Sequence, residues 1–420
     1  MEKKLVTQTL SAMKHISNSL LTLVTALRRS WKREWFLCLI IFVVMRLIAS
    51  FLGYMVASGP EPEPLSSGPI NIASESLLHQ DWFSQQYINI WKRWDTDWYL
   101  KIAAFGYDPA DGTVSYWPLY PWLIGRLGAL TGNFLLSALL ISNLAVLAVF
   151  ILLYEVAHVE GLTSEQAGSA VISLAVFPSA FFLFTAYTDA LFLAFILSAW
   201  LAARRSHWLL AGLMGGFATL TRLQGALLVP VLGLLWLREA AGFHLLKPTT
   251  WRKSLTVLRD PSWLATLLPG LAFVGWNIHL NAAGLGNVTE MLAAHWGIHT
   301  VPPWIGIWLF FIRLFSTPRV FIDYVDLAAL SVILILLTYG LRRLDPILSL
   351  YAWLSLALFF MRGTPPHLLD SFSRYMLAVF PAFLVMAEIP SQVVRVSLWI
   401  ISFLLQIFLL MGFLDWRWVA

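Results

Sequence analysis

Two aspartates in an aromatic segment are the first candidates for chemistry. Asp95 and Asp97 lie within the sequence Trp91-Lys92-Arg93-Trp94-Asp95-Thr96-Asp97-Trp98-Tyr99. On a helix, residues two apart do not face each other, so the pair would clamp a metal ion poorly, and a single catalytic acid is favoured. A carboxylate beside aromatic side chains at a membrane surface suits a general base that takes a proton from a substrate hydroxyl. The alternative is a solvated or capping pair.

Three more charged residues lie within or beside apolar segments: Asp189, Arg222 and Arg374. An ionisable group at membrane depth costs about 2.5 to 3.5 kcal/mol, so such groups tend to pair with each other or to serve a site. Arginine offers a planar fork of donors to phosphate oxygens, and Arg374 is the first choice for this role, followed by Arg222. Two alternatives stay open. Arg374 could snorkel to lipid headgroups, and Arg222 could form a structural pair with Asp189.

The composition indicates the kind of scaffold that holds these residues. Of the 420 residues, 59% are hydrophobic and 12% are charged, and the mean hydropathy is +0.73. Because a soluble domain has about 25% charged residues, a soluble protein is excluded. The net charge of +5 fits basic cytoplasmic loops and gives no support to nucleic acid binding. The single cysteine, Cys38, excludes an intrachain disulfide.

Apolar runs follow a basic N-terminal segment, residues 1–35, which we expect in the cytoplasm. The first run, 36–57, suits an uncleaved anchor better than a cleaved signal peptide, because it is long and carries Arg46. The later runs are 134–157, 167–186, 188–203, 208–222, 225–237, 262–280, 326–341, 345–361, 374–389 and 396–414. We predict an all-α polytopic membrane protein of about 11 transmembrane helices, with residues 36–420 as one domain.

Loop charges give a topology for these runs. With a cytoplasmic N-terminus, Arg204-Arg205, the segment 238–259 and Arg342-Arg343 lie inside, as the positive-inside rule requires. The segments predicted outside are 58–117, 187–189, 281–303, 362–373 and the C-terminal residues 415–418. The first external loop, 58–117, is acidic, and a helix over 91–103 would rest an aromatic stripe on the membrane surface. The segment 304–320 suits an interfacial helix better than a span.

A series of motifs runs along the chain in a defined order. They are Arg93-Trp94-Asp95, Trp98-Tyr99, Ile102-Ala103, Gly106-Tyr107, Trp117-Pro118-Leu119-Tyr120-Pro121, Phe177-Pro178-Ser179-Ala180-Phe181-Phe182, Tyr187-Thr188-Asp189-Ala190-Leu191-Phe192, Thr221-Arg222-Leu223-Gln224-Gly225 and Ser373-Arg374-Tyr375. In order and spacing, this series resembles the PIG-V family of mannosyltransferases, within the GT-C class of polytopic glycosyltransferases that use polyprenyl-phosphate sugars. The resemblance covers residues 91–381. It departs from the family pattern at Asp189, where Glu is commoner, and at Leu223-Gln224, which replaces Ser-Asn.

The resemblance implies a GT-C-like bundle that transfers mannose from polyprenyl-phosphate mannose. The acceptor would be a hydroxyl of a lipid-linked or glycan molecule on the external or lumenal side, and the transfer would invert the anomeric carbon. Asp95 would be the general base, with Asp97 as the second candidate, and Arg374 and Arg222 would bind the donor phosphate. The candidate substrate contacts are Arg93, Trp94, Trp98, Trp117, Tyr120 and Asp189.

Other partners and functions are weighed against this interpretation. No cofactor or metal is expected, since His295 and His299, at i and i+4, have only Glu290 as a nearby acid. A lipid or sugar transporter or flippase is the alternative function, but the two halves of the chain show no repeat of the kind that transporters carry. Eukaryotic PIG-V members act on the glycosylphosphatidylinositol anchor precursor, which bacteria lack. We expect a bacterial plasma membrane, or the endoplasmic reticulum in a eukaryote, and the acceptor stays open.

Overall fold

The computed structural model of the chain describes residues 34–59, 76–242, 259–316, 318–363 and 368–419. These residues form helices joined by turns and loops, and their one β pairing is an isolated bridge between Thr300 and Arg362. The predicted all-α class is therefore confirmed. The predicted cytoplasmic segment 1–35 lies, apart from its last two residues, outside the described residues.

The described α-helices follow one another in this order. After a first helix, Glu34–Ala57, come α3 (Asp95–Phe105), α4 (Leu119–Thr131), α5 (Phe134–Val159), α6 (Ser164–Ala175), α7 (Asp189–Arg204), α8 (Trp208–Thr221), α9 (Leu228–Ala241), α11 (Leu268–Ala282), α12 (Val288–Trp296), α13 (Pro303–Ser316), α14 (Phe321–Gly340), α15 (Pro346–Phe359), α16 (Phe372–Tyr375), α17 (Pro381–Ala387) and α18 (Gln392–Leu414). Short 3-10 or π segments lie at Ser84–Ile88, Asn89–Trp91, Gly112–Ser115, Ala180–Phe184, Leu223–Leu227, Pro261–Leu267 and Met376–Ala378.

Several of these helices are long and apolar enough to cross a membrane. In the described part of the chain there are six: Glu34–Ala57, Phe134–Val159, Leu223–Ala241, Pro261–Ala282, Phe321–Gly340 and Gln392–Leu414. Shorter apolar helices are Trp208–Thr221, Pro303–Ser316 and Pro346–Phe359. The chain is an integral, multi-pass membrane protein. The number of crossings, expected as about 11, stays a prediction.

Two apolar runs that read as single segments in the sequence are broken in the structure. The run 167–186 contains most of α6 and then, after Pro178, the 3-10 turn Ala180–Phe184. The run 374–389 contains the end of α16, a 3-10 turn and α17, which starts at Pro381. Proline has no backbone N–H to continue a helix, so it interrupts a helix but is accepted in the first turn of a new one, as Pro381 is in α17. Both breaks bring non-helical backbone to the place where the charged residues lie.

Local signals in the sequence explain other helix ends. The Asn133 side chain accepts a hydrogen bond from the backbone of Leu136 and so caps α5, and Thr163 forms a capping box with Gln166 at the start of α6. Gly132, with φ of 72°, ends α4 in a left-handed conformation that a larger residue would adopt at a cost. The tight α4–α5 turn follows from Gly132 and Asn133.

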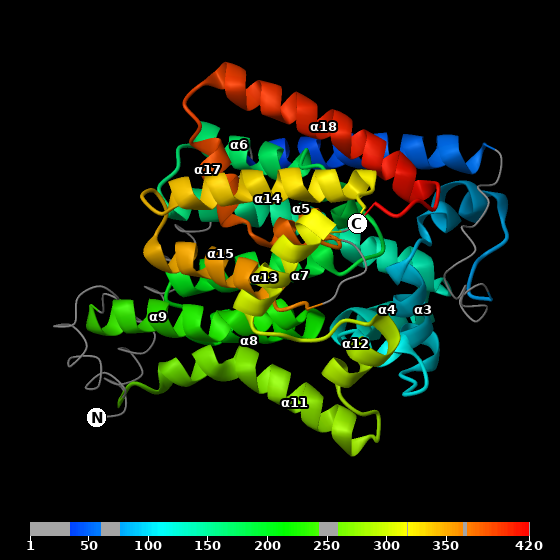
Figure 1. The fold of residues 1–420 in the computed structure, drawn as a ribbon, viewed down its shortest axis with the longest axis horizontal. Coiled ribbons are helices and arrows are strands. Elements are labelled where there is room, and N and C mark those ends of the chain that lie inside the picture. Colours follow the sequence, from blue (N-terminus) through cyan, green and yellow to red (C-terminus); the bar gives the residue numbers. More distant parts are fainter. Residues whose placement is uncertain (1–33, 60–75, 243–258, 317, 364–367, 420) are drawn as a thin grey trace, which may run out of the picture.

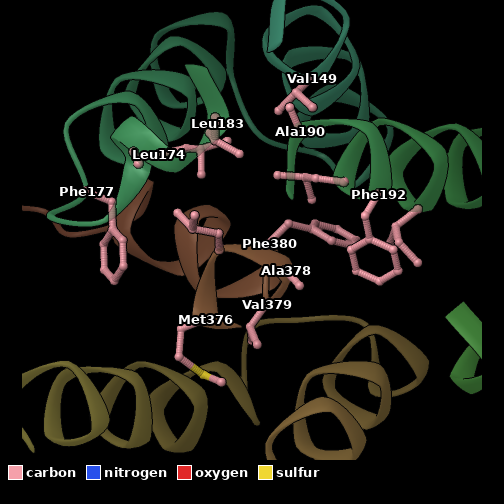
Figure 2. Packing of buried hydrophobic residues seen from close by; sticks show 14 of the residues in the cluster. Val149, Leu174, Phe177, Leu183, Ala190, Phe192, Met376, Ala378, Val379 and Phe380 are labelled. Carbon is pink, nitrogen blue, oxygen red and sulfur yellow. The ribbon is translucent and has the colours of Figure 1, made fainter. Parts of the chain in front are cut away.

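The long helices lie alongside one another, while α3, α4, α12 and the C-terminal end of α18 lie at one end of the bundle, on the right in Figure 1. At the centre, α7 packs against both α5 and α8, and α8 packs against α11. Figure 2 shows apolar side chains from α5, α6, α7 and the segment 376–380 packing in one core cluster, among them Val149, Phe192 and Phe380. Close approach is possible where residues are small: a Cβ on Gly212 of α8 would lie 2.0 Å from the carbonyl oxygen of Ala265.

Candidate active site

Four charged side chains from distant parts of the chain form a continuous series of ion pairs. Arg374 Nη1 lies 2.9 Å from Asp95 Oδ2, and Arg374 Nε lies 3.1 Å from Asp189 Oδ2. Asp189 Oδ1 lies 2.5 Å from Arg222 Nη1. The Asp189 side chain is 1% exposed and that of Asp95 is 28% exposed. The structure confirms the Arg222–Asp189 pair that the sequence left open, and it adds a bridge through Arg374 to Asp95.

Each member of this series lies at a helix end or a break. Asp95 and Asp189 are the first residues of α3 and α7, where a negative side chain interacts favourably with the helix N-terminus. Arg222 follows the last residue of α8 and is extended, with φ of −154° and ψ of 145°. Arg374 belongs to the short helix α16. The ends of four elements therefore bring two acids and two arginines together.

The residue before Asp95 has an unusual backbone conformation. Trp94 has φ of 48°, which is uncommon for a bulky residue and costs about 1 to 3 kcal/mol. Its ring packs edge-on against Trp416 and Trp418, with centroids 5.8 and 5.1 Å away. These contacts with the C-terminal residues hold Trp94 in place, and the strained turn directs Asp95 into the site.

Tyrosines surround the charged series. Tyr187 accepts a hydrogen bond from the Asp95 backbone N–H and donates one to the Arg93 carbonyl, both at 3.2 Å. The Arg374 guanidinium lies over the Tyr187 ring, 4.4 Å from its centroid. Tyr116 donates a hydrogen bond of 3.3 Å to Asp95 Oδ1. Burial, together with the nearby Asp95 carboxylate, raises the pKa of Tyr116 well above its usual value, so its hydroxyl keeps its proton and remains a donor.

A cavity of about 340 Å³ opens beside Asp95. Its charged lining residues are Asp95, Arg222, Arg362, Asp370 and Arg374, and its aromatic lining residues are Tyr99, Tyr116, Trp117, Trp296, Phe359, Tyr375 and Trp418. The volume is that of a small-molecule site, and the few polar groups among aromatic walls are typical of such sites. A sugar ring, which stacks on aromatic faces and presents hydroxyls and a phosphate to charged groups, matches this lining.

The second acid of the aromatic segment does not reach the cavity. Asp97 Oδ1 lies 2.8 Å from Lys92 Nζ, and both side chains are largely buried. Arg93 likewise faces the protein: its Nε donates to the Leu414 carbonyl at 2.9 Å, and its guanidinium lies over the Trp416 ring. The structure thus brings Asp95 to the cavity and places Asp97 and Arg93 behind it.

The remaining candidate substrate contacts fall into residues that line the cavity and residues that do not. Trp117 lines the cavity, whereas Tyr120 is fully buried, with its hydroxyl 2.8 Å from Ser142 Oγ. Trp98 stacks on Tyr116, with centroids 6.0 Å apart, and so supports the wall without lining it. Asp189 does not line the cavity either, because both its oxygens face arginines.

The predicted aromatic stripe on the membrane surface is wrong for Trp91 and Tyr99. Their side chains are 1% and 5% exposed and belong to the protein core. The α-helix begins only at Asp95, after a 3-10 turn, Asn89–Trp91, and it packs against α4. The segment 304–320 does contain a helix, α13, with Trp304 and Phe315 exposed, which leaves its interfacial position a prediction.

Sequence reasoning did not single out four residues that line the cavity: Tyr116, Trp296, Arg362 and Asp370. Tyr116 directly precedes the motif 117–121, but nothing in the sequence indicated that its hydroxyl faces Asp95. Arg362 and Asp370 both lie in the predicted external segment 362–373. Arg362 Nη2 is 2.7 Å from Asp370 Oδ2. An arginine at the edge of the apolar run 345–361 was the available signal. Trp296 lies next to His295, which the sequence suggested only as a possible metal ligand together with His299.

The histidines considered as a metal pair do not share a helical face. His295 lies in α12, which ends at Trp296, and Gly297 adopts a left-handed conformation before His299. Within the described ranges, no three side chains of the metal-ligating types gather closely enough to hold an ion.

A comparison with known families matches residues 114–259 to the family described as dolichyl-phosphate-mannose-protein mannosyltransferase. The matched region covers about a third of the chain and includes Asp189 and Arg222, but neither Asp95 nor Arg374. The match supports a membrane glycosyltransferase of the class that the sequence resemblance implied. It leaves the PIG-V assignment and the sugar as predictions. No protein of curated function matches the chain.

Several solved structures are similar to the chain. The Archaeoglobus fulgidus oligosaccharyltransferase tethered with an acceptor peptide is 15% identical, with coverage of 92% of this chain and 56% of that one and a TM-score of 0.43. ArnT from Cupriavidus metallidurans, bound to undecaprenyl phosphate, is 16% identical, with coverage of 86% and 62% and a TM-score of 0.46. The chain thus spans little more than half the length of these proteins.

Proposed function

We propose that the protein is an integral-membrane glycosyltransferase that transfers mannose from a polyprenyl-phosphate donor to a hydroxyl of a lipid-linked or glycan acceptor. The observation that carries this proposal is the position of Asp95: a partly exposed carboxylate at a cavity of about 340 Å³, paired with an arginine of a buried ion-pair series. The match to a mannosyltransferase family over residues 114–259 supports the reaction class and the sugar.

The residues of the cavity have distinct tasks in this reaction. Asp95 accepts the proton of the acceptor hydroxyl, whose oxygen attacks the anomeric carbon of the sugar. The bond from that carbon to the phosphate oxygen breaks on the opposite face, and its electron pair leaves with the polyprenyl phosphate, so the configuration is inverted. A positioned base contributes about 10² to 10⁴ in rate.

Arginines neutralise the leaving phosphate in this proposal. Arg374 and Arg222 both line the cavity, and each guanidinium has five N–H donors, of which the ion pairs to Asp95 and Asp189 use only some. Charge on the departing phosphate grows as the bond breaks, so fixed cations in a site shielded from water stabilise the transition state. Arg362, whose side chain is 20% exposed, is a third cation at the same cavity.

The side of the membrane follows from the predicted topology. The threading that puts Arg204-Arg205 and Arg342-Arg343 in the cytoplasm puts the loop that carries Asp95 outside and Arg374 at the external start of the run 374–389. We therefore propose transfer on the external face of a bacterial plasma membrane, or on the lumenal face of the endoplasmic reticulum in a eukaryote. The PIG-V family is the proposed family within the GT-C class.

Transfer of radiolabelled mannose from polyprenyl-phosphate mannose tests the proposal. Wild-type protein in lipid vesicles is compared with Asp95→Asn, which keeps the shape of the side chain and removes its basicity. The matched control is Asp108→Asn, an acid of the same loop that does not line the cavity. We expect a loss of about 10² to 10⁴ for Asp95→Asn and nearly full activity for the control.

Three other outcomes are informative. Equal transfer by the wild type and Asp95→Asn would remove Asp95 as the base. Transfer of a different sugar would revise the donor alone. A wild-type protein that transfers no sugar from any polyprenyl phosphate, but moves such lipids across the vesicle membrane, would replace the proposal with the flippase alternative.

A further inference from the structure

The backbone turns sharply just before Arg374. Asp370 and Ser371 have φ angles of 40° and 72°, in the left-handed region that residues other than glycine seldom adopt. Two such residues in succession persist only where the surrounding structure holds them, and they tend to occur at functional sites. The turn leads within three residues to the guanidinium that bridges Asp95 and Asp189.

A buried carboxylate on α14 holds the residues that follow this turn. Asp326 Oδ1 accepts the backbone N–H of Ser373 at 2.9 Å, and Oδ2 accepts that of Phe372 at 3.1 Å. Asp326 is 2% exposed and lies in a helix that is apolar enough to cross a membrane. A carboxylate in such a helix is costly and usually serves a function, and here both of its oxygens are directed to two adjacent backbone groups.

Other side chains fix the same short segment from different directions. Ser179, in the break after α6, donates its hydroxyl to the Ser373 carbonyl at 2.8 Å. Arg362 Nη1 donates to the Asp370 carbonyl at 2.9 Å. Ser373 is therefore held through both its N–H and its C=O, directly before Arg374. With the backbone fixed at this residue, the direction in which the Arg374 side chain leaves the turn is also fixed.

We propose that Asp326 is a positioning residue for Arg374, so that the two backbone hydrogen bonds of Asp326 place the Arg374 guanidinium between Asp95 and the donor phosphate. Asp326 itself does not line the cavity, and it acts through the turn. This inference rests on the proposed function, in which Arg374 binds the phosphate. A displacement of about 1 Å at a catalytic group can lower the rate about a hundredfold, so losing a backbone hydrogen bond of Asp326 should have a measurable effect on transfer.

A double-mutant cycle between Asp326 and Arg374 tests this proposal. In Asp326→Asn the amide offers one acceptor oxygen where the carboxylate offered two, so one of the two backbone N–H groups loses its partner. We measure mannosyl transfer and the affinity for polyprenyl phosphate in wild type, Asp326→Asn, Arg374→Lys and the double variant. In the wild-type background, Asp326→Asn should lower the transfer rate by about tenfold to a hundredfold. In the Arg374→Lys background, the same substitution should lower the rate by no more than about twofold.

If Asp326→Asn only reduced the amount of folded protein, it would lower transfer by the same factor in the wild-type and Arg374→Lys backgrounds. That outcome would overturn the proposal. The matched control is Asp323→Asn. Asp323 also binds backbone N–H groups, those of Val320 and Leu368, one turn earlier on α14. Its effect should be the same in both Arg374 backgrounds. If Asp326→Asn does not fold, Ser179→Ala removes a single hydrogen bond of the same turn and should show the same dependence on Arg374.

The design separates this inference from the proposed function. If Arg374→Lys changes neither transfer nor affinity, the phosphate-binding role of Arg374 fails, and the inference fails with it. If Arg374→Lys weakens both but the Asp326→Asn loss is undiminished in that background, the proposed function stands and the positioning role of Asp326 is refuted. The affinity measurement decides between these outcomes even where transfer by Arg374→Lys falls below detection.

Discussion

Replacing Asp189 by asparagine should destabilise the protein far more than removing an exposed acid. Asp189 has a 1% exposed side chain and joins two arginines that are 10% and 7% exposed. Asparagine keeps the size of the side chain but leaves Arg222 and Arg374 facing each other without the charge between them. Removing one partner of a buried ion pair costs about 3 to 5 kcal/mol, because an uncompensated charge remains in a site shielded from water.

Thermal unfolding of the protein in detergent, followed alongside transfer activity, measures this effect. The matched control is Glu155→Gln, which breaks an ion pair with Arg205 whose side chains are 19% and 47% exposed. An exposed pair of this kind contributes about 0 to 1 kcal/mol. We expect a midpoint several degrees lower for Asp189→Asn and almost no change for the control. Activity per folded molecule should fall at least about tenfold, since Arg374 loses one of its two anchors.

A compensating variant tests whether unpaired charge is the cause of the lost stability. If the cost arises from unpaired charge, Asp189→Asn combined with Arg222→Met should recover at least about half of the lost stability, because an apolar replacement of a buried pair is often close to neutral. A double variant that is less stable than either single variant would refute the account. So would an Asp189→Asn protein as stable as the wild type, because the buried series would then contribute nothing.

Further expectations concern the surroundings of the site. Tyr116→Phe removes one hydrogen bond to Asp95 and should lower transfer by no more than about tenfold in steady-state assays. Because the pKa of Tyr116 is raised in the folded state, its stabilising effect is complete below pH about 10 and is lost as the pH rises further, so unfolding scans between pH 9 and 11 should show a smaller alkaline loss for Tyr116→Phe. Lys92→Met strands the largely buried Asp97 and should reduce folded yield by chromatography, with normal activity in the remaining folded protein. Gly212→Ala forces a Cβ against Ala265 and should lower folded yield, whereas Gly275→Ala, where the space is open, should not.

The sequence was sufficient to predict the class of the protein and several residues of the candidate site. Composition excluded a soluble protein, and apolar length predicted spans at 134–157 and 396–414, because a membrane imposes a minimum apolar length on any helix that crosses it. The structure has helices there at Phe134–Val159 and Gln392–Leu414. Asp189, Arg222 and Arg374 stand out in the sequence because each is a charge in or beside an apolar segment, where it requires a partner. These signals are local, and a sequence displays them directly.

Helix interruptions were harder to predict. The runs 167–186 and 374–389 are mostly apolar, and their prolines did not reveal where the chain leaves the helix or where it resumes. The same limit applies to the aromatic segment, in which Trp91 and Tyr99 became core residues although their spacing also suited a membrane surface. Apolar side chains satisfy either environment equally well, so periodicity cannot distinguish protein core from lipid.

Pairing was decided by the tertiary structure alone. Asp95 and Asp97 have the same chemistry and nearly the same sequence context, yet Asp95 lies beside Arg374, 279 residues away, and Asp97 lies beside Lys92. The task of Asp326 was equally hidden, because a carboxylate that binds backbone N–H groups has partners of no particular residue type. The sequence by itself determined that this is a helical membrane protein with costly charges that need partners. Which charges meet, and which acid faces the cavity, depends on helix ends that only packing brings together.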